Sequence, residues 1–230
     1  MLATVEARRW AGAGLALGLA AASGIARAED LATPGQELRP ASAEAEPSAA
    51  AQVARWVLAS SDNGGLPFVV VDKPRALVSV YDGDGRLVGA APALLGLALG
   101  DGSAPGVGDR ALSAIHPDER TTPAGRFVAS YGAASGQKKV LWIDYATAIS
   151  LHPVITSEPK ERRPERLSTP TAEDNRITYG CINVSGAFYR EVVTSTIRDR
   201  AIVYILPDVA PLESVFPGYH RWAQTNAAMP

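Results

Sequence analysis

The sequence predicts an exported protein whose mature part is a single, mainly β domain. From Phe68 onward the chain consists mostly of short apolar runs, rich in β-branched residues and separated by Gly, Pro and Asp, which is the pattern of strands joined by turns. Only two stretches have the spacing of an amphipathic helix. The first 28 residues have the features of a secretory signal, and no internal repeat or second-domain pattern follows them.

Residues 1–28 contain the three parts of a signal peptide. Arg8 and Arg9 form a basic start, residues 10–25 are apolar and rich in small side chains, and Ala26-Arg27-Ala28 is a cleavage site. A membrane anchor is the alternative, but the apolar run is shorter than the ~20 residues that a spanning helix needs. The paired arginines also leave a twin-arginine export signal open. We therefore expect no membrane span in the mature form.

Charge and composition argue against several kinds of partner. The formal net charge is −2 and no basic block is present, so nothing indicates nucleic-acid binding. Three of the 22 basic and one of the 24 acidic residues lie in the signal segment, which leaves 19 basic and 23 acidic residues in the mature chain, a net charge of −4. The three histidines and one cysteine lack the spacing of a zinc site. We expect no metal and no cofactor, and the oligomeric state stays open.

A linker and a short helix are expected to follow the signal segment. Residues 29–50 are rich in Ala, Pro, Glu and Ser and have no apolar periodicity, which is typical of a flexible linker. Residues 48–60 then favour a helix, because Val53, Trp56 and Val57 recur on one face.

Strands are expected to make up most of the remaining chain. The predicted strands are residues 68–71, 76–81, 86–90, 127–130, 139–144, 148–151 and 201–206. The second and third are joined by Asp82-Gly83-Asp84-Gly85, which is a hairpin turn signal. Because residues 76–81 carry apolar side chains on both faces, we expect this strand to be covered on both sides.

A second helix is expected near the C-terminal end of the domain. Ser185 is a suitable N-cap for it. The apolar positions that share one face of this helix are Phe188, Val192, Val193 and Ile197. Residues 208–230 are predicted to be a tail, in which Phe216 and Trp222 can pack while the last residues fray.

The only cysteine, Cys181, follows Gly180 in a short apolar segment. A lone cysteine in an oxidising compartment pairs with another molecule, is buried, or is a working thiol. Gly180 permits positive φ and a close backbone approach to a substrate. Thr178 and Asn183 can hold the turn through hydrogen bonds from side chain to backbone.

A nucleophilic thiol needs a neighbouring base or cation. The chain has three histidines, and of these His152 stands at the end of an apolar, strand-like segment. A histidine at a strand end and a cysteine at a turn can meet in space, but their sequence separation neither proves nor excludes the pair. The alternative is that Cys181 is a small buried hydrophobic residue and His152 a hydrogen-bonded loop residue.

Residues 153–176 form a long segment with four prolines inside the predicted domain. Its charged cluster comprises Glu158, Lys160, Glu161, Arg162, Arg163, Glu165 and Arg166. A loop of this length is usually functional, disordered or both, so both a lid over Cys181 and a solvated excursion stay open. Its basic residues, and Arg176 near the thiol, could receive carboxylates of a peptide; surface solubility is the alternative.

Two ordered motifs resemble those of the YkuD-type L,D-transpeptidases, a family of bacterial cell-wall enzymes. Leu151-His152, followed downstream by Thr178-Tyr179-Gly180-Cys181-Ile182-Asn183, is similar to the family's histidine and Ser/Thr-x-Gly-Cys-hydrophobic-Asn/Arg motif. Thr122-Pro123-Ala124-Gly125-Arg126-Phe127 is similar to its Thr-Pro-x-Gly-x-Phe segment. The similarity covers about residues 68–207, although the 153–176 segment is longer than in shorter members of the family.

The resemblance implies a β-sandwich-like catalytic domain with short peripheral helices and the thiol beside a groove. The domain organisation that we predict is a signal peptide at residues 1–28, a linker and short helix at 29–66, the catalytic domain at 67–207 and a tail at 208–230. The implied location is outside the cytoplasm, in the periplasm or at the cell wall. The implied partners are peptidoglycan stem peptides.

The resemblance also implies a reaction. Cys181 would attack a stem tetrapeptide, release D-alanine and form a thioester, from which an acceptor amine makes a 3-3 cross-link that contributes to cell-wall biogenesis and cell shape. His152 would be the base, with Pro153 O orienting its ring and Gly180 N–H at the oxyanion. Tyr179 stands where many members have histidine and cannot carry positive charge.

Substrate contacts are expected from Thr178, Asn183 and Arg176. Three alternatives stay open at this point: an L,D-carboxypeptidase with water as acceptor, a ligase that attaches a lipoprotein to the wall, and a wall-binding module without turnover.

Overall fold

The computed structural model describes residues 47–134 and 137–227. The predicted signal peptide and nearly all of the predicted linker lie outside the described residues. Within these residues, every helix falls short of the length or apolar character that crossing a bilayer requires.

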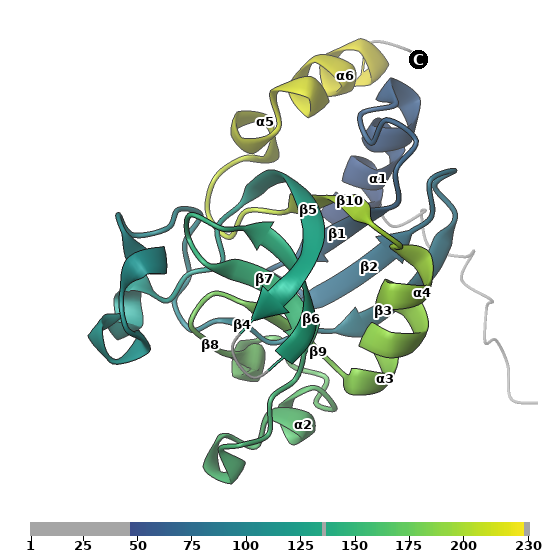
Figure 1. Ribbon diagram of the computed structural model, residues 1–230. Coiled ribbons are helices and arrows are strands. Elements are labelled where there is room, and N and C mark those ends of the chain that lie inside the picture. Colours follow the sequence, from purple (N-terminus) through teal and green to yellow (C-terminus); the bar gives the residue numbers. More distant parts are fainter. Residues whose placement is uncertain (1–46, 135–136, 228–230) are drawn as a thin grey trace, which may run out of the picture. The chain divides into compact units, whose positions relative to one another are not determined.

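The described elements follow one another as Figure 1 labels them. The strands are β1 (Phe68–Asp72), β2 (Leu77–Tyr81), β3 (Leu87–Pro92), β4 (Leu95–Gly96), β5 (Gly125–Ala134), β6 (Gln137–Asp144), β7 (Ile149–Pro153), β8 (Arg176–Thr178), β9 (Ile182–Val184) and β10 (Arg200–Ile205). The α-helices are α1 (Ala49–Ser60), α2 (Arg163–Arg166), α3 (Gly186–Phe188), α4 (Thr194–Thr196), α5 (Leu212–Val215) and α6 (Pro217–Ala227). Each predicted strand thus lies within or overlaps an observed one.

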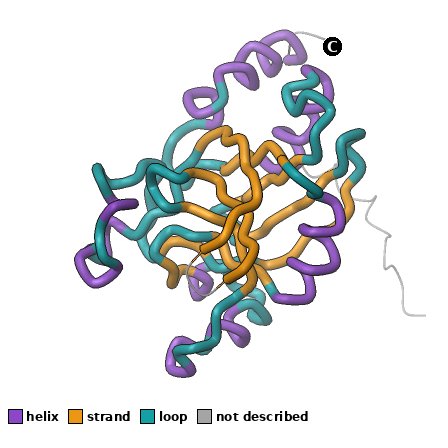
Figure 2. The backbone as a smooth tube through the Cα atoms, viewed as in Figure 1, coloured by secondary structure: helices purple, strands orange, loops and turns teal. Residues whose placement is uncertain are grey.

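Within the described residues, eight strands form one mixed sheet in the order β3-β2-β1-β10-β5-β6-β7-β9, and β4 pairs with β8 separately. The two edges of the large sheet come together through Leu94, two residues beyond β3. Its N–H donates to Asn183 O at 2.8 Å, and the Asn183 N–H in β9 donates to Leu94 O at 2.9 Å. The sheet is therefore curled and nearly closed (Figures 1 and 2).

The predicted mainly β class is confirmed only in part, as a domain built on one large sheet. The structure is mixed, with helices around one curled sheet. The sandwich implied by the resemblance is not what the sheet shows, because its two edges are bridged to each other instead of belonging to two stacked sheets.

The centre of the sheet is covered on both faces. β1 and β10 pair in parallel, with Phe68 opposite Ile202 and Val70 opposite Tyr204. These four side chains pack with α1 and the C-terminal helices, whereas Val69 belongs to a second core on the other face. A strand covered on both faces is a continuous apolar run rather than an alternating one. The sequence pattern of residues 68–71 follows from this position, and every residue of β1 is buried.

The two predicted helices are present. α1 begins one residue after the predicted start and has Ser48 as its N-cap, and the second helix follows its predicted N-cap, Ser185. Ser48 Oγ accepts a hydrogen bond from the Ala51 N–H at 3.2 Å, and Ser185 Oγ accepts one from the Phe188 N–H at 3.1 Å. Such caps satisfy N–H groups that the helix leaves unpaired. The second helix continues from α3 through a π-helical turn (Tyr189–Val193) into α4, and its predicted apolar face packs on the sheet core.

The C-terminal segment is more regular than the tail that the sequence predicts, because it forms α5 and α6. Phe216 and Tyr219 are buried, and their ring centroids lie 6.0 and 6.2 Å from that of Trp56 in α1. Pro217 begins α6, since a proline in the first helical turn loses no intrahelical hydrogen bond. The aromatic residues recur every three positions and so give the helix one packing face. Figure 1 shows α6 beside α1.

Candidate active site

Two neighbouring parallel strands, β7 and β9, present the residues that the sequence predicts to be catalytic. Their register pairs Leu151 with Ile182 and His152 with Asn183. Because successive side chains of a strand alternate between its faces, the two apolar residues enter the core while the two polar residues share the opposite face. Cys181 immediately precedes β9 and belongs to the polar face. The alternation thus brings Cys181 and His152 to the same side of the sheet.

The turn that carries the thiol requires glycine at position 180. Gly180 has φ +128°, and a Cβ there would lie 2.6 Å from Thr121 O and 2.7 Å from Ile149 Cδ1. Thr178 braces the turn: its Oγ1 donates to Cys181 O at 2.7 Å and accepts from the Gly180 N–H at 3.1 Å. The backbone on both sides of the thiol is therefore fixed by one hydroxyl group.

His152 is 7% exposed and is held at both ring nitrogens. Nδ1 lies 2.8 Å from Pro153 O, and Nε2 lies 3.0 Å from Asn183 Nδ2. A carbonyl oxygen can only accept, so Nδ1 carries a proton and donates it to Pro153 O. Burial lowers the pKa of His152 below its usual value; the hydrogen bond to Pro153 O opposes this shift, and the positive charge of Arg163 adds to it.

Cys181 is partly exposed, unlike the deeply buried small residue of the alternative interpretation. Its Sγ lies 3.6 Å from Ser150 Oγ and 3.5 Å from Ala148 O. A cavity of about 340 Å³ lies over it. The residues that line this cavity are Leu112, His152, Ile155, Ser157, Glu158, Glu161, Arg163, Thr178, Tyr179, Cys181 and Asn183. The predicted nucleophile and base therefore share one cavity.

The 153–176 segment forms a wall of this cavity, so it is not merely a solvated excursion. Five of the lining residues come from it. It contains α2 and two 3₁₀ turns, Pro159–Glu161 and Glu173–Asn175. One of its arginines reaches the site: Arg163 Nη1 donates to Asn183 Oδ1 at 2.9 Å, and Arg163 Nε donates to Glu161 Oε2 at 2.6 Å.

Arg176 lies elsewhere, although it is close to Cys181 in sequence. It lines a second cavity of about 510 Å³, larger than the one over the thiol, together with Asp208. Its guanidinium donates to Asp208 Oδ1 at 2.5 Å and to Asp208 Oδ2 at 3.2 Å. The carboxylate that Arg176 binds thus belongs to the protein. The structure does not bring Arg176 into the cavity with Thr178 and Asn183, the other two predicted substrate contacts.

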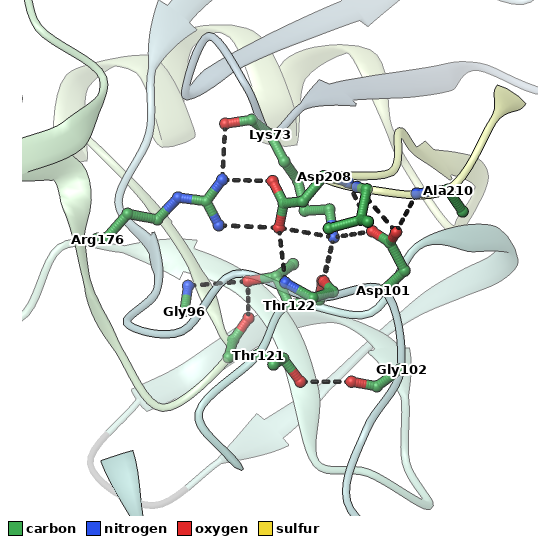
Figure 3. A network of polar contacts seen from close by, with 12 residues as sticks. Lys73, Gly96, Asp101, Gly102, Thr121, Thr122, Arg176, Asp208 and Ala210 are labelled. Atoms are coloured by element: carbon green, nitrogen blue, oxygen red, sulfur yellow. Dashed lines mark hydrogen bonds and ion pairs between the residues drawn. The ribbon is translucent and has the colours of Figure 1, made fainter. Parts of the chain in front are cut away.

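Arg176 and Asp208 belong to a buried polar network (Figure 3). At its centre is Lys73, whose side chain is completely buried. Lys73 Nζ lies 2.6 Å from Gly100 O, 2.8 Å from Thr122 O, 2.9 Å from Asp101 Oδ1 and 3.1 Å from Asp208 Oδ2. A buried ammonium group is tolerated only when it is paired and hydrogen-bonded. We call Lys73, Gly100, Asp101, Thr122, Arg176 and Asp208 the Lys73 network.

Asp101 is the acceptor at the other end of the Lys73 network. Burial by itself raises the pKa of its carboxyl group, but hydrogen bonds from Ala210, Asp208, Lys73 and Val209 outweigh burial and hold the pKa at about 2. Asp101 is therefore ionised at neutral pH and fixes the chain just after β10 (Figure 3).

Thr122 connects the Lys73 network to the thiol. Its Oγ1 donates to Gly180 O at 2.8 Å and accepts from the Gly96 N–H at 2.9 Å. Its carbonyl oxygen accepts from Lys73. The Thr-Pro-x-Gly-like segment, which the resemblance places near the substrate groove, thus supports the turn that precedes Cys181.

Tyr179 lines the cavity and stacks against Arg120, whose Cζ lies 4.1 Å from the ring centroid. Cation–π contacts of this kind favour the face of the ring. The arginine places a positive charge beside the position at which many members of the family have histidine.

Three residues around the site are not predicted from the sequence. Lys73 gives no local signal, because lysine is almost always exposed. Ser150 follows from strand alternation once the register of β7 and β9 is known. Arg163 is one of several basic residues in its segment, and nothing in the sequence distinguishes it from Arg162. Among the described residues, no three His, Cys, Asp or Glu side chains are grouped as metal ligands.

No family model and no curated protein matches the chain. One solved structure similar to it is an L,D-transpeptidase (Yku) from Stackebrandtia nassauensis, with TM-score 0.36 and 12% identity over 61% of this chain and 55% of that one. Another is the LD transpeptidase LdtMt1 in complex with imipenem, with TM-score 0.36 and 16% identity over 61% and 58%. A third is the helical cell shape determining protein Pgp2 from Campylobacter jejuni, with TM-score 0.42 and 15% identity over 70% and 57%.

The match spans a little over half the length of each of these proteins. At such TM-scores and identities the likeness carries no argument about the reaction, which we infer from the side chains of the site. The chain is structurally similar to L,D-transpeptidase domains and to Pgp2 at low sequence identity.

Proposed function

We propose that this protein is a cysteine-dependent L,D-transpeptidase that acts on peptidoglycan stem tetrapeptides outside the cytoplasm. The observation that supports this proposal is the placement of Cys181 and His152 on one face of neighbouring parallel strands, at one cavity. A thiol and an imidazole so placed are the pair that acyl transfer through a covalent intermediate needs. The sequence motifs around both residues supply the substrate class.

In the proposed reaction, Sγ of Cys181 attacks the carbonyl carbon that precedes the terminal D-alanine, while its proton passes to Nε2 of His152, which gives up its hydrogen bond from Asn183 Nδ2. The tetrahedral intermediate then collapses: the C–N bond breaks, the leaving amine of D-alanine takes the proton from Nε2, and a thioester remains on Cys181. An amine of a second stem attacks the thioester, forms the 3-3 cross-link and restores the thiol. Proton transfer of this kind contributes about 10²–10⁴-fold to rate.

The oxyanion of the tetrahedral intermediate needs a hydrogen-bond donor. The Gly180 N–H is engaged by Thr178 Oγ1, so we assign this role to the N–H of Cys181 itself. One such donor is worth ~3 kcal/mol. The Tyr179 hydroxyl can add a second hydrogen bond from the cavity wall, but it cannot contribute the positive charge of a histidine.

The cavity offers a peptide both apolar and charged contacts. Leu112 and Ile155 are 60% and 40% exposed in its lining and can contact the peptide's apolar groups. Glu158 is an exposed carboxylate in the same wall and suits an acceptor that carries an ammonium group. This acidic wall favours an amine over water as acceptor.

Product analysis tests the proposal. The mature protein is incubated with a disaccharide-tetrapeptide, and released D-alanine and cross-linked dimer are quantified by chromatography and mass spectrometry. We expect both products with the wild-type protein and neither with Cys181→Ala.

The other products distinguish the alternatives. If disaccharide-tripeptide forms without any dimer, the protein is an L,D-carboxypeptidase instead of a transpeptidase. D-alanine release that requires a protein lysine would indicate a ligase that attaches lipoproteins. Tight binding of the tetrapeptide by wild type and Cys181→Ala alike, without any product, would overturn the enzymatic proposal in favour of a wall-binding module.

A further inference from the structure

A chain of polar contacts runs from the 153–176 segment to the imidazole of His152. Glu161 accepts from Arg163 Nε at 2.6 Å, and Arg163 Nη1 donates to Asn183 Oδ1 at 2.9 Å. Asn183 Nδ2 lies 3.0 Å from His152 Nε2, and His152 Nδ1 lies 2.8 Å from Pro153 O. The middle of the chain is closed to solvent: Asn183 is 1% exposed and the Arg163 side chain 13%.

The chemistry of the two ends leaves one arrangement of protons. Arginine is always charged and has only donors, so Asn183 can bond it only through Oδ1. The NH₂ group of Asn183 must then face His152. At the other end Pro153 O can only accept, so Nδ1 of His152 carries a proton. Nε2 faces a donor and must therefore be an unprotonated acceptor, which makes His152 a neutral imidazole.

A second proton on His152, at Nε2, would break this series of contacts in either orientation of the Asn183 amide. If Asn183 kept its orientation, its N–H would face the N–H at Nε2. If the amide turned over to offer Oδ1 to His152, its NH₂ would face the guanidinium of Arg163. Either way two donors meet in a buried place, which costs the desolvation of both.

We propose that Arg163 is a positioning residue: it fixes the orientation of the Asn183 amide and thereby holds His152 as the neutral imidazole that is protonated at Nδ1. Arg163 acts through Asn183 and does not need to touch the substrate. As a statement about catalysis the proposal rests on the proposed function, because it assigns His152 the role of a base that enters the cycle unprotonated.

The backbone supports this role. Asn183 is fixed from both sides, by its register with His152 and by two backbone hydrogen bonds with Leu94. Arg163 is held by its own segment: Arg166 Nε donates to Glu161 O at 2.8 Å, and the other end of the Arg166 guanidinium donates to Asp174 O. The series of polar contacts from Glu161 to His152 therefore joins the 153–176 segment to strands β7 and β9.

The charges around His152 act in the same direction. Burial and the positive charge of Arg163 both lower the pKa of His152, against the opposing effect of the Pro153 carbonyl. The titratable or charged side chains that face His152 across the cavity are Glu158, Glu161, Arg163, Tyr179 and Cys181. On its other side, β6 pairs with β7 through Leu141, Trp142 and Asp144. Asp144 is the charged one of the three; it lies opposite Ile149 and accepts from the Ala146 N–H and the Thr147 hydroxyl.

The test is a ¹⁵N and ¹³C NMR titration of the histidine rings in the mature protein. The chain has three histidines, so a His152→Gln spectrum assigns the signal of His152. In the wild-type protein we expect Nε2 unprotonated, Nδ1 protonated, and a titration midpoint below the ordinary value of about 6.5. In Arg163→Met the amide is free to turn and to accept from Nε2, so the midpoint should rise by about one pH unit, a tenfold change in proton affinity.

Two further variants separate positioning from a general loss of charge or structure. Arg163→Lys keeps a cationic group that can only donate, and should keep the lowered midpoint. Arg162→Met removes the neighbouring exposed charge and should leave the midpoint of His152 where it is. If activity is measurable, the acid limb of kcat/KM should move up with the NMR midpoint, because a base works only when unprotonated.

Either of two results would overturn the inference: a wild-type His152 protonated at Nε2 at neutral pH, or an Arg163→Met midpoint equal to that of the wild type. The first needs only the assignment by His152→Gln and so does not depend on whether Arg163→Met folds. Both are read from the resting protein, so an enzymatically silent protein would refute the proposed function and leave this inference standing.

Discussion

The two sides of the Cys181 turn use arginine in opposite ways. On the cavity side, Arg163 donates hydrogen bonds to the neutral amide of Asn183 and to the half-buried Glu161. On the far side, Arg176 binds both carboxylate oxygens of Asp208, a residue whose side chain is 2% exposed. The first arrangement influences the protonation of a neighbouring ring, and the second neutralises charge inside the fold.

This difference teaches that partner and burial, not residue type or distance in sequence, decide what a basic residue does. Arg176 is five residues from Cys181 and is the one that the sequence favours as a carboxylate receptor. Its guanidinium is already matched by Asp208, whereas Arg163, 18 residues away, reaches the site. The Lys73 network supports the turn from behind, and Arg163 adjusts the imidazole in front of it.

The largest effect on stability is expected from the centre of the Lys73 network. Lys73→Met leaves Asp101 and Asp208 buried without their ammonium partner, and removing one partner of a buried ion pair costs about 3–5 kcal/mol. Urea unfolding of the mature protein measures this loss. The control is Arg86→Met, which breaks an ion pair whose arginine side chain is 83% exposed and should cost less than about 1 kcal/mol. Equal losses in the two variants would contradict the structural role of Lys73.

A smaller loss of stability, but a direct effect on the thiol, is expected from Gly180→Ala. The added Cβ would meet Thr121 O at 2.6 Å, and the positive φ alone costs about 1–3 kcal/mol. The turn should shift and the rate of thioester formation should fall. Gly186→Ala is the matched control, because its Cβ would meet nothing within 4 Å and it lies in a helix that favours alanine. A fully active, fully stable Gly180→Ala would show that the turn tolerates a side chain.

The smallest effects sharpen the comparison between the two arginines. Arg176→Met removes a charged partner of Asp208, but this carboxylate keeps Lys73 as its second partner, so the loss should be about 1.5–3 kcal/mol, less than that of Lys73→Met, and the pKa of His152 should not move. Arg163→Met breaks a partly exposed ion pair, worth about 1 kcal/mol or less, together with one hydrogen bond to the buried Asn183 amide, and should raise that pKa. Unfolding and the NMR titration of both variants give the two readings. A larger loss of unfolding free energy in Arg163→Met than in Arg176→Met, or a larger shift of the His152 pKa in Arg176→Met, would mean that the two roles are assigned wrongly.

Much of the fold is predictable because it depends on local patterns. The apolar runs at residues 68–71 and 201–206 are strands covered on both faces, and Ser48 and Ser185 cap the helices that follow them. The aromatic residues of the C-terminal segment indicate packing but not helices, because Pro211 and Pro217 interrupt the segment and a proline is as typical of a turn as of a helix start. The bridge between Leu94 and Asn183 joins the two edges of the sheet over a long sequence separation, so no local sequence pattern predicts it.

The candidate site is predictable to a similar extent. Cys181, His152 and the brace at Thr178 follow from motif and residue chemistry, and strand alternation places the first two on one face. Lys73 could not be found, because its burial depends on acceptors from three distant segments. Arg163 and Arg162 have the same chemistry, and only the backbone of their segment decides which one points to Asn183.

The most direct test of the central claim, that Cys181 and His152 form an acyl-transfer pair, is the intact mass of the mature protein during turnover. Samples of wild type, His152→Ala and Cys181→Ala are quenched in acid after mixing with disaccharide-tetrapeptide. We predict a wild-type adduct equal to the substrate minus alanine, slower formation of the same adduct by about 10²–10⁴-fold in His152→Ala, and no adduct in Cys181→Ala. An unmodified wild-type protein at every time point, or an adduct that persists in Cys181→Ala, would contradict the claim.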